Sequence, residues 1–318
     1  MFYLNEKDIL STISLNSVMD AIEEAYKIFE KGDFFMPDRM HVDYGAKNLL
    51  YMPCFKANLF GTKILTVFPE NAGKHPVIDG LMLLNDLETG EPKGLLDGKV
   101  LTAVRTGAVG GVGVRHTTPE DLSTVGLIGA GVQGFYQLRY ACAARPIKKI
   151  YIYDAYKKDL SDFINRLEKV IDKSIEINVC ENTEELAKKS ELIITCTNAT
   201  SPILPDNEEL LRGKHFIGIG SYKPEMREFP DALSKLVDEV IIDTEFALEE
   251  SGDLITPINN GLLKESQMTT FAEFLKGKKD ISKTTLFKSV GMALFDVIVA
   301  EYIYNEALKQ EKGQKIEL

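Results

Sequence analysis

Three glycines near the middle of the chain have a spacing that suits a phosphate group. Gly129, Gly131 and Gly134 follow directly after the apolar segment 125–128. In such a G-x-G-x-x-G turn the first glycine permits a tight turn, the second lets backbone approach a diphosphate, and the third lets a helix pack closely on the strand. The N-terminus of that helix favours negative charge. The pattern therefore predicts a dinucleotide site, and Val132 and Gln133 of the same turn belong to it.

An acid lies where a ribose would need one. The apolar segment 149–153 predicts a second strand, and Asp154 follows it, 20 residues after Gly134. A carboxylate at this position accepts hydrogen bonds from the ribose hydroxyls. Strand, turn, helix, strand and acid together make the dinucleotide interpretation more specific than the glycines alone.

The elements around this turn alternate between short apolar and amphipathic segments from residue 122 to about 243. Strands are expected at 124–128, 149–153, 175–179, 192–197, 216–220 and 237–242. Strands that alternate with helices predict an α/β domain with a doubly wound parallel sheet of the Rossmann type. Right-handed crossovers would place the ends after Ile128, Thr195 and Ile219 along one edge, where ligands bind.

The N-terminal part has a different pattern. Apolar positions at helical spacing predict a helix that is capped by Ser17 and stops at Gly32. Residues 40–100 carry short apolar runs between turn residues, which indicates a mostly antiparallel sheet. The segment 101–116 is rich in glycine, and each interior glycine costs a helix roughly 1 kcal/mol relative to alanine. Another backbone or a ligand is therefore expected very close to it.

Two domains follow from these patterns. Thr118 and Pro119 suggest the N-cap and first residue of a new helix, and so a junction. The helical segment 290–311 comes too late for the nucleotide domain. We expect a smaller α+β domain for substrate binding and dimerisation at 1–117 and 290–318, and a Rossmann-type dinucleotide-binding domain at 118–289.

Composition limits the classes of partner. The chain has 318 residues and a formal net charge of −11, without a long Lys/Arg cluster. This argues against nucleic acid and anionic membranes as partners. No leader-like or bilayer-spanning segment stands out. Neither cysteines nor histidines show metal-ligand spacing. We expect reduced thiols in a cytoplasmic protein without a bound metal; the cysteines are Cys54, Cys142, Cys180 and Cys196.

Three cations are candidates for binding an anion. Arg39, Lys63 and Arg105 each have an ordinary alternative as solvated or salt-bridged side chains. Lys63 lies inside an apolar strand, where alternation can direct it toward a site instead of water. Arg105 has only small residues around it.

Several motifs resemble one known family. The run from Gly61 to Ala108 (GTKILTVFPEN to TAVRTGA), GAGVQG, the segment ALEESGDL at 247–254 and FKSVGMAL at 287–294 are similar to motifs of the ornithine cyclodeaminase/μ-crystallin family, in family order. That family includes certain alanine dehydrogenases and ketimine reductases. The resemblance extends over nearly the whole chain and implies a homodimer formed through the first domain.

The resemblance implies a role for each matching residue. Arg39, Lys63 and Arg105 match positions that hold the carboxylate of the substrate, and a guanidinium fork suits a carboxylate. The resemblance also implies that Lys63 carries or steers a proton, so Lys63 and Arg105 are the catalytic candidates. The remaining matches concern the cofactor: Thr106 near its phosphates, and Thr197, Asn198, Ser221, Val290 and Gly291 along it.

Two positions refine the function that the resemblance implies. Members similar to μ-crystallin that use NADPH tend to have Asn-Arg-Thr where this chain has residues 154–156. A carboxylate at Asp154 would repel the extra phosphate, so NAD(H) is expected; Lys157 and Lys158 keep NADPH as the alternative. Cyclodeaminases carry an aspartate where Ser221 stands, and a serine hydroxyl is a poor base.

The expected function is that of an NAD(H)-dependent oxidoreductase acting on the C–N bond of a small amino or cyclic imino acid, as a ketimine or pyrroline-2-carboxylate reductase or an alanine dehydrogenase does. The alternative is an ornithine cyclodeaminase, which forms proline and ammonia without net redox change. A third hypothesis is a non-catalytic binding protein like μ-crystallin. Three cations directed at one pocket argue against a protein that binds only apolar ligands.

Overall fold

The computed structural model describes residues 1–277 and 280–317. The chain divides into two compact units, one of residues 1–105 with 292–318 and the other of residues 106–291. The first boundary falls inside helix α3 (Gly98–Thr117), earlier than the junction expected at residue 117. The helix start expected at Thr118 and Pro119 is wrong, because this segment makes a turn that leads into strand β8. Of the expected domain ranges, residues 278–279 and 318 lie outside the described residues.

The first unit contains a sheet with the strand order β16-β1-β7-β6-β5-β4-β2, in which β3 pairs with β4. Strands β4 to β7 are antiparallel neighbours, which confirms the antiparallel sheet expected at 40–100. The strands are β1 (Phe2–Leu4), β2 (Phe34–Phe35), β3 (Met40–Tyr44), β4 (Lys47–Lys56), β5 (Leu59–Val67), β6 (Ile78–Asp86), β7 (Pro92–Asp97) and β16 (Gln314–Lys315). The first unit also has a 3-10 turn at Pro69–Asn71.

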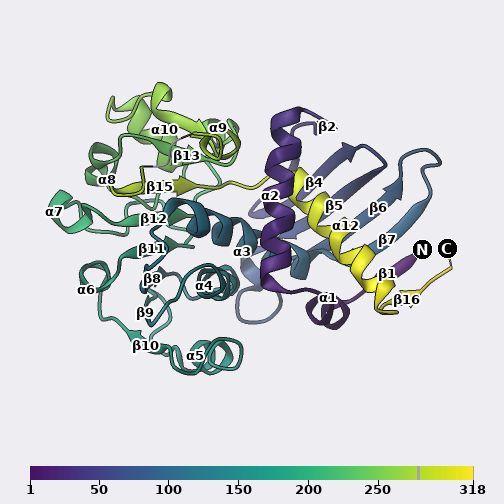
Figure 1. Cartoon of the computed structure of the whole chain (residues 1–318), viewed down its shortest axis with the longest axis horizontal. Helices are drawn as coiled ribbons and strands as arrows, with labels where there is room; N and C mark the ends of the chain where they lie inside the picture. The colour runs from purple at the N-terminus through teal and green to yellow at the C-terminus, as the bar shows by residue number, and fades with distance from the viewer. Residues whose placement is uncertain (278–279, 318) are drawn as a thin grey trace. The chain divides into compact units, whose positions relative to one another are not determined.

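Three helices accompany this sheet: α1 (Glu6–Thr12), α2 (Leu15–Lys31) and α12 (Ala293–Lys309). Helix α2 ends at Gly32, whose φ of 71° permits the left-handed cap. Its N-cap is Ser14, whose hydroxyl accepts a hydrogen bond from Ser17 N, so the cap expected at Ser17 is wrong by one turn. Helix α12 packs against β4, β5 and β6 and against α2 (Figure 1).

Alternation along the strands gives the first sheet two different faces. Side chains such as Met52 of β4, Lys63 of β5 and Met82 of β6 are neighbours across the strands and are buried. The side chains between them on the opposite face, among them Ile64 and Leu81, keep part of their surface exposed. One face is therefore a core, and the other stays partly open in the single chain.

The second unit contains a parallel sheet with the order β10-β9-β8-β11-β12-β15-β13-β14. This confirms the doubly wound α/β fold, and β8 and β9 have the expected bounds. Strands β14 and β15 were not expected, because each is short and lacks a long apolar run. The strands are β8 (Thr124–Ile128), β9 (Lys149–Tyr153), β10 (Glu176–Val179), β11 (Leu192–Thr195), β12 (His215–Gly218), β13 (Val240–Ile242), β14 (Met268–Thr270) and β15 (Thr285–Lys288).

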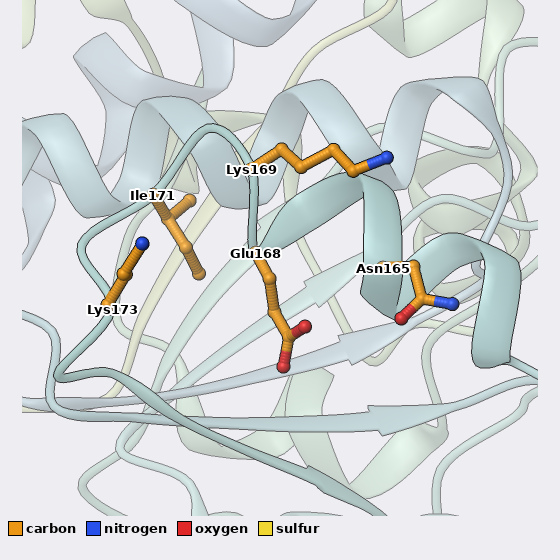
Figure 2. A pocket seen from close by; sticks show the side chains of 5 residues that line it. All are labelled: Asn165, Glu168, Lys169, Ile171 and Lys173. Atoms are coloured by element: carbon orange, nitrogen blue, oxygen red, sulfur yellow. The ribbon is translucent and has the colours of Figure 1, made fainter.

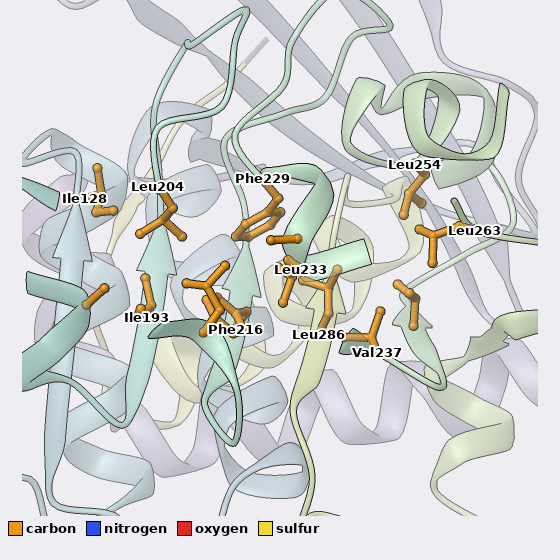
Figure 3. Packing of buried hydrophobic residues seen from close by; sticks show 14 of the residues in the cluster. Ile128, Ile193, Leu204, Phe216, Phe229, Leu233, Val237, Leu254, Leu263 and Leu286 are labelled. Atoms are coloured by element: carbon orange, nitrogen blue, oxygen red, sulfur yellow. The ribbon is translucent and has the colours of Figure 1, made fainter. Parts of the chain in front are cut away.

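Buried residues of the second unit form an apolar cluster on one face of its sheet. Figure 3 shows strand residues such as Ile193 and Phe216 beside Phe229 and Leu233 of the following segments. Phe216 and Phe229 meet edge to face, with ring centroids 5.9 Å apart. The helices are α4 (Val132–Ala144), α5 (Ser161–Leu167), α6 (Thr183–Lys189), α7 (Glu208–Leu211), α8 (Asp231–Leu236), α9 (Ala247–Glu250), α10 (Gly252–Asn259) and α11 (Phe271–Phe274), with a 3-10 turn at Glu265–Gln267.

The glycines of α3 allow close packing within the second unit. A Cβ atom added to Gly110 would lie 1.8 Å from Oε1 of Gln137, and one added to Gly107 would lie 2.6 Å from the ring of Tyr140. The close neighbours of these two glycines are thus side chains of α4, and those of Gly113 are Phe287 and Ile217, so side chains take the place of the close backbone that was expected. No helix in the described part of the chain combines the length and apolar character needed to cross a membrane.

Candidate functional site

Lys63 forms a buried ion pair in the first unit. Strand alternation directs its side chain into the core side of the sheet, where it has no exposed surface. Its Nζ atom lies 2.7 Å from Oδ2 of Asp296, in the first turn of α12. The Nε atom of Arg105 lies 2.8 Å from the other carboxylate oxygen, Oδ1. One aspartate therefore holds two of the predicted cations together.

The surroundings of Lys63 change its proton affinity. The pKa of Lys63 falls from 10.5 to about 7 in total: burial lowers it most, the Arg105 charge also lowers it, and Asp296 raises it. The charge of Arg39, in the segment between β2 and β3, also lowers the pKa of Lys63. Both arginine charges thus act on Lys63, and one carboxylate pairs with Lys63 and with Arg105. A lysine with a pKa near 7 can exchange a proton at neutral pH.

The glycine turn has the backbone that its sequence predicts. Gly129 has a φ of 101°, which favours glycine, and its N–H donates to the carbonyl of Tyr153 at 3.0 Å. A Cβ atom on Gly134 would lie 2.2 Å from the carbonyl oxygen of Gly129, whereas one on Gly131 would meet nothing within 4 Å. Gly131 is the N-cap of α4. Open space in front of a helix N-terminus fits a diphosphate.

Asp154 joins the second strand of this unit to the glycine turn. Its Oδ2 atom accepts a hydrogen bond from Ala130 N at 2.8 Å, and Oδ1 accepts from the N–H groups of Tyr156 and Lys157 at 2.9 Å each. The ammonium of Lys157 donates to the carbonyl of Ala130 at 2.6 Å. Asp154 therefore orders the turn, and the Lys157 charge is already paired with a backbone dipole.

The other predicted cofactor residues follow neighbouring strands of the parallel sheet. Thr197 and Asn198 follow β11, Ser221 follows β12, and Val290 and Gly291 follow β15, so all lie beyond the carboxyl ends of adjacent strands. This is the edge at which such sheets bind ligands.

The side chains at this edge differ in how exposed they are. Asn198 is exposed, whereas Ser221 is fully buried. The hydroxyl of Ser221 donates to the carbonyl of Met226 at 2.6 Å and lies 2.8 Å from the hydroxyl of Ser251. Thr106 lies in α3, and its carbonyl accepts from Gln137 at 2.8 Å. The cofactor contacts of these residues stay predictions.

Comparison with known proteins agrees with this fold and with these motifs. The sequence profile of the ornithine cyclodeaminase/mu-crystallin family matches residues 2–311. The chain belongs to this family. Delta(1)-pyrroline-2-carboxylate reductase of Bacillus thuringiensis subsp. konkukian is 32% identical over 329 residues, covering 100% of both chains. Alanine dehydrogenase of Archaeoglobus fulgidus is 30% identical, covering 98% of this chain and 97% of its own.

Solved structures of similar proteins match this chain over nearly its whole length. The Thermococcus litoralis Delta(1)-pyrroline-2-carboxylate reductase in complex with NADH and L-proline has a TM-score of 0.91 and 32% identity, over 99% of this chain and 100% of that one. An archaeal alanine dehydrogenase dimer with bound NAD has a TM-score of 0.89 and 27% identity, over 100% of this chain and 99% of that one.

Sequence reasoning missed the buried acids of this family member. Asp296 was counted only as part of an apolar helix, although an acid between the apolar residues Phe295 and Val297 signals a buried partner. Asp243 was missed too: its Oδ2 atom accepts from the Ser289 hydroxyl at 2.7 Å and from the N–H groups of Val290 and Gly291 at 3.0 and 2.7 Å. It thereby fixes a segment predicted to line the cofactor.

A depression of about 650 Å³ lies elsewhere in the second unit. Figure 2 shows its lining side chains at the end of α5 and in the turn that follows: Asn165, Glu168, Lys169, Ile171 and Lys173. None of these residues belongs to the predicted sites, and their charges are of both signs. We assign it no part in the chemistry.

Proposed function

We propose that this member of the family is an NAD(H)-dependent oxidoreductase acting on the C–N bond of a small amino or cyclic imino acid. The reductase and dehydrogenase relatives, which match nearly the whole chain, support this class. One observation in the chain itself carries the chemistry. It is the buried Lys63, whose pKa of about 7 suits a group that donates a proton to an imine nitrogen.

The first unit would bind and orient the substrate. Arg39 and Arg105 hold its carboxylate, and Arg105 keeps its place through Asp296. The Lys63 ammonium donates a proton to the imine nitrogen, which makes the neighbouring carbon more electrophilic. The bound cofactor supplies the hydride for that carbon. Proton and hydride together convert the imine to an amine, and the reverse direction oxidises the amino acid.

The second unit would bind NAD(H). The turn from Gly129 to Gly134 holds the diphosphate, and Asp154 faces the ribose and disfavours a 2′-phosphate. The two similar structures named above contain bound NADH and bound NAD, respectively. The further contacts proposed are those of Val132, Gln133, Thr106, Thr197, Asn198, Ser221, Val290 and Gly291.

A homodimer is proposed through the open face of the first sheet. That face carries half-buried apolar side chains, among them Tyr51, Phe55, Ile64 and Leu83, and the exposed Leu81. A contiguous apolar surface favours a protein partner. The archaeal alanine dehydrogenase, at 27% identity, is described as a dimer. We also propose that the two expected domains divide substrate and cofactor binding between them, and that the protein is cytoplasmic.

Turnover assays test the proposed function. NADH absorbance is followed with Δ1-pyrroline-2-carboxylate, with pyruvate plus ammonia, and with other cyclic imino acids. Net loss of NADH with one of them supports the proposal. Ammonia release from ornithine at constant NADH would assign the chain to the cyclodeaminases. Binding of these compounds without turnover would assign it to the non-catalytic members.

A further inference from the structure

Glu228 places one buried carboxylate against two loops. It lies between β12 and α8 and has no exposed surface. Its Oε1 atom accepts hydrogen bonds from N and Oγ1 of Thr197, at 2.7 Å each. Its Oε2 atom accepts from Oγ1 of Thr195 at 2.9 Å and from the N–H groups of Gly220 and Ser221 at 2.9 and 3.2 Å. All of these groups donate to the same carboxylate.

The two loops follow the carboxyl ends of adjacent parallel strands. Thr195 ends β11 and is paired with Gly218, which ends β12. A Cβ atom on Gly220 would lie 2.3 Å from the carbonyl oxygen of Thr197 and 2.5 Å from Oε1 of Glu228. The loops therefore meet at the carboxylate, and no other residue type fits at Gly220 without a shift. A ligand of a parallel sheet binds just beyond such strand ends.

The position of Glu228 is itself fixed by Asp253 of helix α10, which in turn contacts a third strand. The N–H groups of Glu228 and Phe229 donate to Oδ1 of Asp253 at 2.6 and 3.0 Å. The other oxygen of Asp253 lies 3.4 Å from Nζ of Lys288, the fully buried last residue of β15. Lys288 also reaches the carbonyl of Gly218 at 3.4 Å. The connection thus extends from β11 through β12 to β15.

The charges around Glu228 act in opposite directions. Burial and the Asp253 carboxylate raise its pKa, whereas Lys288 and the donors of Thr197 lower it. The backbone N–H groups favour the ionised form, because each carboxylate oxygen faces at least one of them and an N–H group can only donate. A side chain of the same shape but without two acceptor oxygens would therefore fail to hold both loops.

We propose that Glu228 is a positioning residue for the dinucleotide. It holds the backbone of residues 195–197 and 220–221 in the position that the bound cofactor requires. It does not contact the cofactor itself. This inference rests on the proposed function, because Thr197 and Ser221 are cofactor contacts only within it.

The test is NADH binding by Glu228→Gln, followed by cofactor fluorescence. The amide NH₂ replaces one acceptor oxygen and faces donors, so one loop loses its fixed position. We expect the Kd for NADH to rise about tenfold, since hydrogen bonds to charged groups are the strong ones. In turnover, KM for NADH rises, while KM for the imino acid and kcat at saturating NADH change by less than about threefold. Glu225→Gln, an exposed acid of the same segment, is the matched control and should bind NADH as the wild type does.

The outcomes separate the inference from the proposed function. A folded Glu228→Gln protein with wild-type affinity for NADH overturns the inference alone, as does an equal loss in both KM values and kcat. Absence of NADH binding by the wild type overturns the proposed function and the inference with it. If Glu228→Gln does not fold, Thr195→Val removes one donor from Oε2; a Kd raised about threefold supports the inference, and an unchanged Kd contradicts it.

Discussion

The Nζ atom of Lys63 lies 2.7 Å from Oδ2 of Asp296, and neither side chain has exposed surface. Burial alone would favour a neutral lysine, because an isolated charge is costly in a dry interior. Asp296 counteracts this effect, and the pKa of Lys63 settles at about 7. Lys63 can therefore release and regain a proton near neutral pH.

Removal of the Asp296 charge should shift the pH dependence of imine reduction. Reduction needs the protonated Lys63, so its rate falls as pH rises through about 7. Asp296 raises the pKa of Lys63, and Asp296→Asn therefore lowers it and moves the alkaline limb of kcat/KM for the imino acid to lower pH. At pH 8 we expect a loss of about tenfold or more. The measurement is kcat/KM for the imino acid against pH at saturating NADH.

A matched variant separates this effect from a general loss of stability. Glu301 lies on the same helix and pairs with Lys56 of β4 at 2.5 Å. Glu301→Gln removes a helix-to-sheet ion pair but leaves Lys63 untouched, and its pH profile should equal that of the wild type. Identical profiles for Asp296→Asn and the wild type would contradict the role given to the pair.

Alanine substitutions at two glycines of the turn should affect NADH affinity and stability separately. The added methyl group of Gly131→Ala projects into open space, so thermal stability should stay nearly unchanged. The methyl group occupies the place of the diphosphate, so the affinity for NADH should fall about tenfold or more. Alanine at Gly134 collides with the carbonyl of Gly129 and should cost roughly 1–3 kcal/mol in the free energy of unfolding. Calorimetry and NADH titration of both variants test this. A Gly131→Ala protein that binds NADH normally would count against the diphosphate site.

Asp154 should decide between the two cofactors. The wild type should bind NADH at least about tenfold more tightly than NADPH, because the carboxylate repels a 2′-phosphate. Asp154→Asn keeps most of the shape and should reduce this preference. Asp159→Asn, at an exposed acid that accepts hydrogen bonds from Ser161, should keep this preference. Titration of each protein with both cofactors gives the answer, and tighter NADPH binding by the wild type would refute the assignment.

The open sheet face should hold the dimer together. Leu81 is 46% exposed, so a lysine there is tolerated by the single chain but places a charge in the proposed interface. Sedimentation should show a dimer for the wild type and a monomer for Leu81→Lys. Leu308→Lys, 38% exposed on α12, is the control and should remain a dimer. A monomeric wild type would exclude this part of the proposal.

Periodicity and turn residues were enough to predict most of the fold. The apolar runs of β8 and β9 are bounded by turn residues, and they were placed without error. Strand β15 was missed because its four residues carry no distinctive alternation and become a strand only between β12 and β13. The helix start at Thr118 was wrong because the hydroxyl caps the preceding helix instead, donating to the Val114 carbonyl.

The candidate site could be predicted only as separate residues. The spacing of Gly129 to Gly134 is local, and local spacing is readable in a sequence. The partners of Lys63 are not local, since Asp296 lies more than two hundred residues later in the chain. Nor does any spacing relate Glu228 to Thr197, because only the order of strands in the sheet brings them together. An acid within an apolar segment is the signal that would have indicated Asp296, whereas Glu228 lies in the charged segment 222–231 and carries no such signal.

The most direct measurement is the NADH-dependent reduction of cyclic imino acids by the wild type and by Lys63→Ala. Lys93→Ala, which removes a half-exposed lysine of the same sheet, is the control. The wild type and Lys93→Ala should reduce at least one of the compounds, and Lys63→Ala should lose about a hundredfold or more in kcat while it still binds NADH. Undiminished reduction by Lys63→Ala would contradict the assignment of the site.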